Sequence, residues 1–282
     1  MSGWLPVVKS GHKPVIAGVR IIHMSKIVII TGAGSGMGRE ICRYFAERGW
    51  AVGAADISYA RAQKTVEDIS PLHPHILAIG VDIRASGEVK NMLDVCVNRF
   101  DRIDALVNNA GMTDKQHRRI LDTPDKMWQD IISTNVTGSY TCLKECAEVM
   151  GKQGGGNIVN ITSLLGQRGY ARVGDAAYGI SKAALEMLTE CAALELAESN
   201  INVNSAYPGV KVNTGFFDDL DADERQELAG PGIMNELVYL LCMLEPGELN
   251  GKSICVQNWK EAPRLQALFR KYFHGGANER TV

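Results

Sequence analysis

Short apolar runs alternate with amphipathic stretches along the chain from Lys26 onward. Several of these runs are continuously apolar, which is typical of strands covered on both faces of a sheet. We predict strands over 26–31, 51–56, 75–82, 104–109, 157–162, 202–207 and 253–257, and helices over 37–48, 59–69, 86–99, 124–151, 176–199 and 233–244. Thr123-Pro124 indicates a helix start, and Gly49 indicates a helix stop.

Repeated strand–helix units require right-handed crossovers, which produce a parallel sheet with helices on both faces. The pattern therefore predicts an α/β fold, a Rossmann-type doubly wound parallel sheet of about seven strands. No Pro- or Ser-rich linker interrupts it, so we predict one domain over 26–258, an N-terminal extension over 1–25 and a C-terminal tail over 259–282. For the extension, a pendant arm, an extra edge strand at VIAGVRII and a start-site artefact all remain open.

The stretch TGAGSGMG lies between the first predicted strand and the first predicted helix. Its glycines permit a tight turn and a close approach of pyrophosphate, and the free N–H groups of the helix start favour an anion. A plain turn has a similar sequence. However, Asp56 ends the next strand, where a carboxylate can bind the hydroxyls of an adenosine ribose and repel a 2′-phosphate. Position 35, inside the loop, is Ser rather than a base. Loop and acid together indicate dinucleotide binding, with NAD favoured over NADP.

Tyr178 and Lys182 stand four residues apart in a predicted helix, so their side chains project from one face. A nearby ammonium stabilises a phenolate and lowers the pKa of a tyrosine from about 10 toward working pH. Tyr178 is therefore a candidate general acid/base, although a surface pair explains the same spacing. Ser163 ends a predicted strand and can hydrogen-bond a substrate oxygen. Asn135 is unfavourable in mid-helix, so we expect a structural or functional reason for it.

Composition excludes several classes of partner. The net charge of −2 gives no indication of a nucleic-acid or anionic-membrane partner, and no apolar run approaches the ~20 residues that span a bilayer. Seven scattered cysteines without a CxxC pair fit buried, reduced thiols. We therefore expect a cytoplasmic protein, and the sequence contains no cluster of metal ligands.

In this order and spacing, the motifs resemble the short-chain dehydrogenase/reductase family of the single-domain type, over about residues 26–257. The family's TGxxxGxG motif corresponds to TGAGSGMG in this chain, and its NNAG motif corresponds to residues 108–111. The helix asparagine of the family corresponds to Asn135 in STNVTG, and the catalytic serine corresponds to Ser163 in NITS. The PG motif is found in SAYPGV. The resemblance implies a dinucleotide-binding catalytic domain and hydride transfer between NAD and a secondary or small primary alcohol. It also implies a homodimer or homotetramer.

The resemblance assigns four catalytic residues. Tyr178 is the general acid/base, Ser163 holds the substrate oxygen, and Lys182 binds the nicotinamide ribose and lowers the tyrosine pKa. Asn135, through a bound water, links Lys182 to solvent. The implied cofactor-binding residues are Gly32, Ser35, Gly36, Met37, Gly38, Asp56, Ile57, Asp82, Ile83, Asn109, Ala110, Gly111, Tyr178, Lys182, Pro208, Gly209, Val210 and Thr214. No metal is required.

Several interpretations remain open beside an NAD-dependent alcohol dehydrogenase. They are an NADPH-dependent ketone reductase, which Asp56 disfavours, a non-catalytic dinucleotide-binding regulator, and an isomerase or dehydratase with tightly held NAD. Basic residues near the expected pocket leave an anionic substrate open, although solvated loop charge is favoured: Lys115, His117, Arg118, Arg119, Arg168 and Arg172. In the segment 210–232, Phe216 and Phe217 either line an apolar wall or anchor a flap. The tail packs on its own domain or on a partner subunit.

Overall fold

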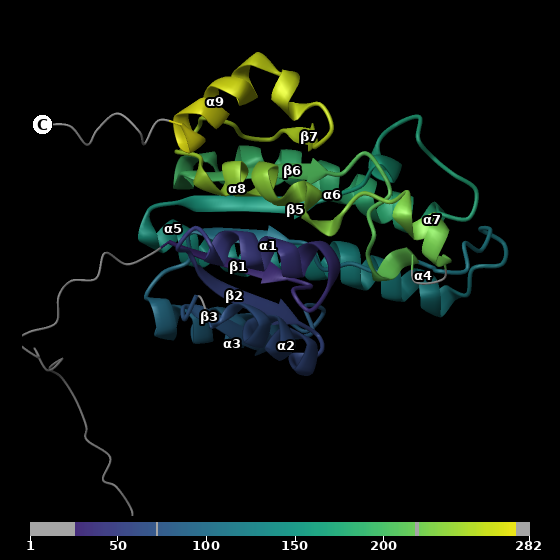
Figure 1. Ribbon diagram of the computed structural model, residues 1–282, viewed down its shortest axis with the longest axis horizontal. Coiled ribbons are helices and arrows are strands. Elements are labelled where there is room, and N and C mark those ends of the chain that lie inside the picture. Colours follow the sequence, from purple (N-terminus) through teal and green to yellow (C-terminus); the bar gives the residue numbers. More distant parts are fainter. Residues whose placement is uncertain (1–25, 72, 218–219, 275–282) are drawn as a thin grey trace, which may run out of the picture.

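The computed structural model describes residues 26–71, 73–217 and 220–274 of the chain. Seven parallel strands form one sheet in the order β3-β2-β1-β4-β5-β6-β7 (Figure 1). The strands are β1 (Ile27–Thr31), β2 (Ala51–Asp56), β3 (Ile76–Gly80), β4 (Ala105–Asn108), β5 (Gly156–Ile161), β6 (Ile201–Tyr207) and β7 (Ser253–Cys255). The order reverses direction between β1 and β4, so the predicted doubly wound α/β fold is confirmed. The predicted extension 1–25 lies outside the described residues.

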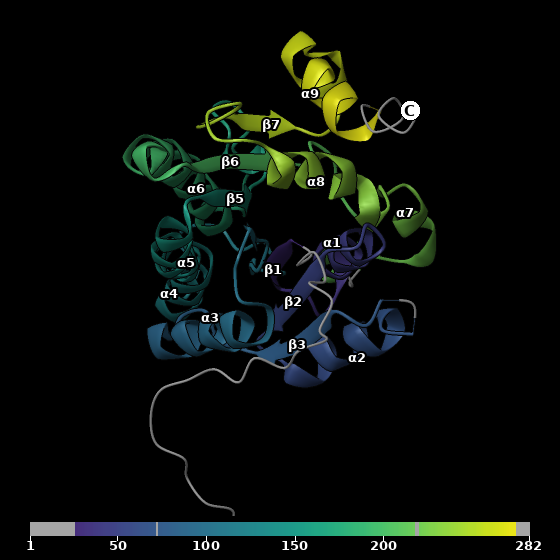
Figure 2. The same ribbon diagram turned by 90° about the vertical axis from the view of Figure 1, so that its left-hand side faces the viewer.

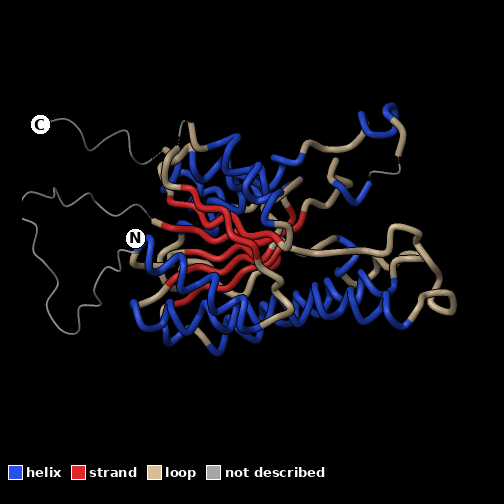
Figure 3. The backbone as a smooth tube through the Cα atoms, turned by 90° about the horizontal axis from the view of Figure 1, so that it is seen from below, coloured by secondary structure: helices blue, strands red, loops and turns tan. Residues whose placement is uncertain are grey.

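Helices cover both faces of the sheet. They are α1 (Gly36–Ala46), α2 (Tyr59–Ile69), α3 (Ser86–Phe100), α4 (Asp125–Ile132), α5 (Ser139–Gln153), α6 (Ala176–Glu195), α7 (Ala222–Gln226), α8 (Asn235–Met243) and α9 (Pro263–Phe273). Figure 2 shows α1, α2 and α8 on one side of the strands and α3, α5 and α6 on the other, and Figure 3 shows the strands between helices. No helix within the described ranges is long and apolar enough to cross a membrane.

The central strand β1 shows why its sequence is continuously apolar. Val28 and Ile30 join the core cluster under α1 and α8, while Ile27 and Ile29 join the cluster under α3 and α5. All of these side chains are fully buried. Each contributes about 1.5–3 kcal/mol by leaving water, so a strand buried on both faces needs apolar residues at every position.

The predicted helix over 124–151 is divided in the structure. A π-helical turn, Ser133–Gly138, separates α4 from α5. The side chain of Asn135, in this turn, accepts from Met112 N (2.8 Å) and donates to Met112 O (2.9 Å) and Ser181 Oγ (2.9 Å). These contacts come from distant segments, so the residue pattern of the helix itself did not predict the bulge.

The C-terminal tail packs on its own fold. Leu265 and Leu268 of α9 are buried in the same core cluster as α1 and α8, and Phe269 and Phe273 pack against that cluster. Lys271 forms ion pairs with Glu245 (3.1 Å) and Glu248 (2.8 Å). Of the two uses left open for this tail, packing on its own domain is the one observed.

Candidate functional site

A cavity of about 1260 Å³ lies at the carboxyl ends of the strands. Nearly all the predicted cofactor-binding residues line it, the exceptions being Gly38 and Lys182, which are buried. The predicted catalytic residues Ser163 and Tyr178 also line it, whereas Asn135 is buried behind it. The cavity thus gathers residues from loops that are far apart in sequence, as expected at the switch point of a doubly wound sheet.

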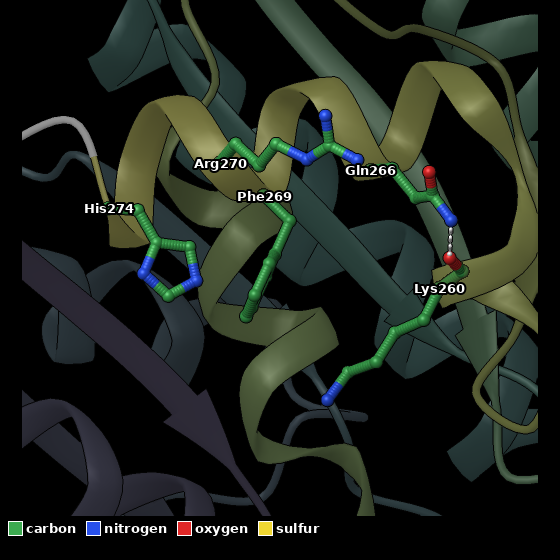
Figure 4. Close-up of a pocket in the computed structure, with 5 residues that line it drawn as sticks. All are labelled: Lys260, Gln266, Phe269, Arg270 and His274. Carbon is green, nitrogen blue, oxygen red and sulfur yellow. Dashed lines mark hydrogen bonds between the residues drawn. The ribbon is translucent and has the colours of Figure 1, made fainter.

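A second hollow lies on the surface of α9. Its walls are Lys260, Gln266, Phe269, Arg270 and His274, and Gln266 Nε2 donates to Lys260 O (2.6 Å), as Figure 4 shows. None of the predicted functional residues belongs to it, so the cavity at the strand ends is the candidate site.

The glycine loop is tightly packed against β1 and β4. Gly32 has φ +67°, and a Cβ on Gly38 would lie only 2.2 Å from Gly32 O, so neither position tolerates a side chain. Thr31 Oγ1 accepts from the N–H groups of Asn109 (3.1 Å) and Ala110 (3.0 Å), which ties the loop to the end of β4. No side chain caps the start of α1, so its first N–H groups can bind an anion. This cradle fits a pyrophosphate.

Asp56 is only 6% exposed and its carboxylate already has protein donors. Oδ2 accepts from Gly34 N (3.0 Å), while Oδ1 accepts from Ser58 N (2.9 Å) and from an Arg61 guanidinium nitrogen (2.9 Å). Arg61 also lines the cavity. The positive charge of Arg61 offsets the repulsion that the charge of Asp56 alone would exert on a 2′-phosphate.

Two further polar residues near the glycine loop and the cavity are held by contacts within the protein. Arg39 is partly buried and donates to Gly34 O (2.8 Å), so it supports the glycine loop. Asp82, predicted to contact adenine, forms an ion pair with Arg84 (2.6 Å), and the hydrogen bond from Arg84 lowers the pKa of Asp82. Its predicted contact stays a prediction.

Tyr178 and Ser163 both line the cavity, and Ser163 acts to lower the pKa of the Tyr178 hydroxyl. Phe216 packs edge-on against the Tyr178 ring, with centroids 6.0 Å apart. Burial raises the pKa of Tyr178 to about 12, and the effect of Ser163 opposes this only in part. The causes of this shift are burial, Ser163 and the charge of Asp175, so the expected lowering of the Tyr178 pKa by Lys182 stays a prediction.

Lys182 is buried to 3% exposure beside the tyrosine. Its Nζ donates to Ile161 O (2.9 Å) and lies 5.6 Å from the centroid of the Tyr178 ring. Burial lowers the pKa of Lys182 to about 8, and the charge of Glu186 opposes that shift. A Cβ on Gly111 would lie 3.5 Å from Lys182 Nζ and 3.4 Å from Asn135 Oδ1, so lysine and asparagine approach the same glycine. The water-linked relay through Asn135 stays a prediction.

Only some of the basic loop residues reach the cavity. Lys115, His117, Arg118 and Arg172 line it, whereas Arg119 and Arg168 do not. His117 Nδ1 lies 2.8 Å from Asp175, and Arg118 pairs with Asp114 at 2.8 Å. Much of the charge in this loop is therefore compensated locally. Across the described ranges, no group of histidine, cysteine and acidic side chains could hold a metal ion.

Arg61, which lines the cavity, and Glu186, which lies one turn after Lys182, are among the charged residues that were not predicted from the sequence. The position of each residue relative to a predicted site residue is the signal that could have identified it. Arg61 lies in the first turn of the helix that follows Asp56, and Glu186 lies one helical turn after Lys182. Neither spacing identifies a partner, because the residues that each one contacts depend on how the segments pack.

The comparisons with known proteins agree with this geometry. The family model for the short chain dehydrogenase matches residues 26–225. The chain is 36% identical to the 3-oxoacyl-[acyl-carrier-protein] reductase FabG of Staphylococcus epidermidis over 204 residues, which covers 70% of this chain and 81% of that protein.

Solved structures show the same fold. A short-chain type dehydrogenase/reductase from Mycobacterium marinum is 30% identical with a TM-score of 0.75, over 82% of this chain and 94% of that one. The 3-ketoacyl-(acyl-carrier-protein) reductase from Brucella melitensis, complexed with NADH, is 26% identical with a TM-score of 0.73, over 82% and 96%. With the cradle, the Ser–Tyr pair and the buried lysine in one cavity, the chain belongs to the short-chain dehydrogenase/reductase family of oxidoreductases, which act with NAD or NADP.

Proposed function

We propose that this enzyme reduces a ketone to a secondary alcohol with a reduced nicotinamide cofactor and catalyses the reverse oxidation as the pH rises. The observation that carries the proposal is the Ser163–Tyr178 pair at the cavity wall, with the pKa of the tyrosine raised to about 12. A phenol with this pKa is protonated at neutral pH and is ready to act as an acid. The relatives named as oxoacyl reductases support this direction. The proposal therefore favours the alternative reductase over the alcohol dehydrogenase that the sequence favoured.

The chain's own residues supply the proton and hold the reacting oxygen. The nicotinamide, when bound, supplies the hydride to the carbonyl carbon. The hydroxyls of Ser163 and Tyr178 both bind the carbonyl oxygen, and Tyr178 donates its proton to that oxygen as negative charge develops there. The ammonium of Lys182 stabilises the phenolate that remains. Phe216 packs edge-on against the tyrosine ring.

Asp56 and Arg61 together govern the choice of cofactor in this proposal. The carboxylate can still accept a hydrogen bond from a ribose hydroxyl, because a carboxylate offers about four acceptor positions and three are occupied here. The guanidinium offers donors to a 2′-phosphate. We therefore expect both NADH and NADPH to bind, with NADH favoured by less than about tenfold, or ~1.4 kcal/mol.

The outer face of α6 has features that favour self-association of the enzyme. Ile180, Met187 and Leu194 recur every seven residues on this helix and are 48%, 59% and 81% exposed. A stripe with that repeat is self-complementary, so two copies of α6 can pack about a two-fold axis. The proposed partner of this surface is a second copy of the chain.

The decisive experiment measures NADH oxidation with a panel of ketones that includes 3-oxoacyl thioesters, beside the Tyr178→Phe variant. We expect turnover by the wild type and a loss of about 10²–10⁴-fold in kcat for the variant, because the acid is removed. NADH binding, followed by cofactor fluorescence, should change less than twofold. A variant that keeps a third or more of the wild-type kcat would contradict the proposal.

A further inference from the structure

One carboxylate outside the catalytic set accepts three side-chain hydrogen bonds. Glu186 lies one turn after Lys182 on α6, and donors from three other segments reach it. Its Oε1 accepts from Thr162 Oγ1 (2.5 Å) and Gln167 Nε2 (2.8 Å), and its Oε2 accepts from Ser205 Oγ (2.5 Å). Hydrogen bonds to a carboxylate from several directions fix its position, so these contacts hold the Glu186 side chain in one orientation.

The donors of this cluster flank the catalytic serine on both sides. Thr162 is 3% exposed and directly precedes Ser163. Gln167 ends the short 3-10 turn Leu164–Gly166, which Ser163 caps by accepting from Leu165 N (3.2 Å). Glu186 therefore fixes the residue before Ser163 and the end of the turn after it. A displaced serine would lose its alignment with the Tyr178 hydroxyl, and small displacements are costly for catalysis.

The same carboxylate is the negative charge that acts on Lys182. Burial lowers the pKa of Lys182 to about 8, and Glu186 is the group that opposes this shift. The other described groups around Lys182 Nζ are neutral: the Ile161 carbonyl on β5, the Asn135 amide in the π-helical turn, and the Tyr178 phenol on α6 itself. Loss of the carboxylate would leave a buried ammonium without a counter-charge, which favours its deprotonation.

We propose that Glu186 is a positioning residue, which aligns Ser163 from both sides and places a negative charge one helical turn from Lys182. The proposal rests on the proposed function for the reaction that it serves. The arrangement of the cluster does not depend on which ketone is the substrate.

The first test needs no substrate. The protein is labelled with ¹⁵N-lysine, and long-range ¹H–¹⁵N spectra follow the titration of Lys182, whose resonance is assigned by its absence in Lys182→Met. We expect a midpoint near pH 8 in the wild type and a midpoint lower by more than 0.3 units in Glu186→Gln, because the attractive charge is removed. Glu190→Gln, one turn further along α6 and exposed, is the matched control and should titrate as the wild type does.

Glu186→Gln could fail to fold, because it leaves buried donors that were paired with a charge. In that case Thr162→Val, Ser205→Ala and Glu186→Leu are combined, which removes the charge and its two buried hydroxyl donors together. The Lys182 midpoint should fall in this variant as well. A midpoint within 0.3 units of the wild type, in whichever variant folds, overturns the proposal.

The second readout is the pH profile with the ketone identified above. The alkaline limb of kcat should move to lower pH in Glu186→Gln, because Lys182 loses its proton earlier, while the KM for NADH changes less than twofold. Glu186→Asp keeps the negative charge, so the alkaline limb of its kcat profile should lie close to that of the wild type. An unshifted limb would contradict the role of Glu186. Failure to find any ketone substrate would instead contradict the proposed function and leave the lysine titration as the test.

Discussion

At the scale of single residues, burial dominates the chemistry of the proposed site. It raises the pKa of Tyr178 to about 12 and lowers the pKa of Lys182 to about 8, so both shifts favour the uncharged form of each side chain. Neutral pH therefore leaves Tyr178 protonated and Lys182 largely protonated as well. This pair of states is the one that the reduction of a ketone requires.

The pH dependence of the two directions follows from these pKa values. The ionised fraction of Tyr178 is small below its pKa and grows about tenfold for each pH unit. We expect kcat/KM for reduction to be nearly constant from about pH 6 to 7 and to fall through about pH 8 as Lys182 loses its proton, whereas kcat/KM for oxidation rises over the same range. Initial rates in both directions with one ketone–alcohol pair at constant ionic strength measure this. A reductive rate that already falls below pH 7 would show a much lower tyrosine pKa.

Arg61 provides a prediction about cofactor choice. In Arg61→Ala, the charge of Asp56 is no longer offset, and a donor for the 2′-phosphate is lost. A hydrogen bond to a charged group contributes about 1.5–3 kcal/mol, so the Kd for NADPH should rise roughly 10- to 100-fold while the Kd for NADH changes less than threefold. Fluorescence titration measures both.

Lys64→Ala is the matched control for this variant. Lys64 lies on the same helix and pairs with Asp68 at 2.9 Å, outside the cavity. The Lys64→Ala variant should leave the dissociation constants of NADH and NADPH unchanged. An equal loss of NADH and NADPH affinity in Arg61→Ala would mean that the arginine only supports the loop and does not read the phosphate.

At the scale of elements, α6 has two faces with different proposed roles. Tyr178, Lys182 and Glu186 recur every four residues toward the cavity and the sheet, while Ile180, Met187 and Leu194 recur every seven residues on the outside. The Tyr–Lys spacing could be predicted from the sequence, because residues four apart share a helix face. The partners of Glu186 could not be predicted from the sequence. Thr162 follows the end of β5 and Ser205 lies in β6, and only the packed fold brings both residues to Glu186.

The exposed apolar residues Ile180, Met187 and Leu194 on the outer face of α6 lead to a prediction for Met187→Glu. A carboxylate placed at the centre of a self-complementary apolar contact would be buried without a counter-charge, so the variant should run as a monomer where the wild type is a dimer or larger. Size-exclusion chromatography with light scattering measures the mass. Glu190→Gln, on the same helix, should keep the wild-type mass. A monomeric wild type would overturn the proposed association.

At the scale of the whole molecule, α9 completes the core on one face of the sheet. Leu265 is 7% exposed and belongs to the cluster that also contains Phe45 of α1 and Leu240 of α8. The C-terminal segment is therefore a structural part of the fold and lies apart from the cavity, whose walls include no residue of α9.

We expect Leu265→Ala to lower the free energy of unfolding by about 2–5 kcal/mol, because it removes buried methyl groups and leaves a cavity. Urea denaturation followed by circular dichroism measures this loss. Gln266→Ala, at the adjacent and more exposed position, should change stability by less than about 0.5 kcal/mol. A loss in Leu265→Ala below 1 kcal/mol would show that α9 does not contribute to the cooperative core.

The sequence by itself determined the features that depend on local periodicity and on fixed spacing. Strands buried on both faces are apolar at every position, so β1 and β2 could be placed from their residues alone. The fold class followed from the alternation of strands and helices. The candidate residues Ser163, Tyr178 and Lys182 followed from their positions at a strand end and on one helix face.

The tertiary structure alone decided features that require segments far apart in sequence to meet. Asn135 lies in a π-helical turn, and its side chain bonds to Met112 and Ser181. Arg61 offsets the charge of Asp56 because the glycine loop holds that carboxylate beside α2. The pKa of Tyr178 belongs to the same class, since a four-residue spacing predicts a nearby charge but not the extent of burial, and here burial is the largest cause of the shift.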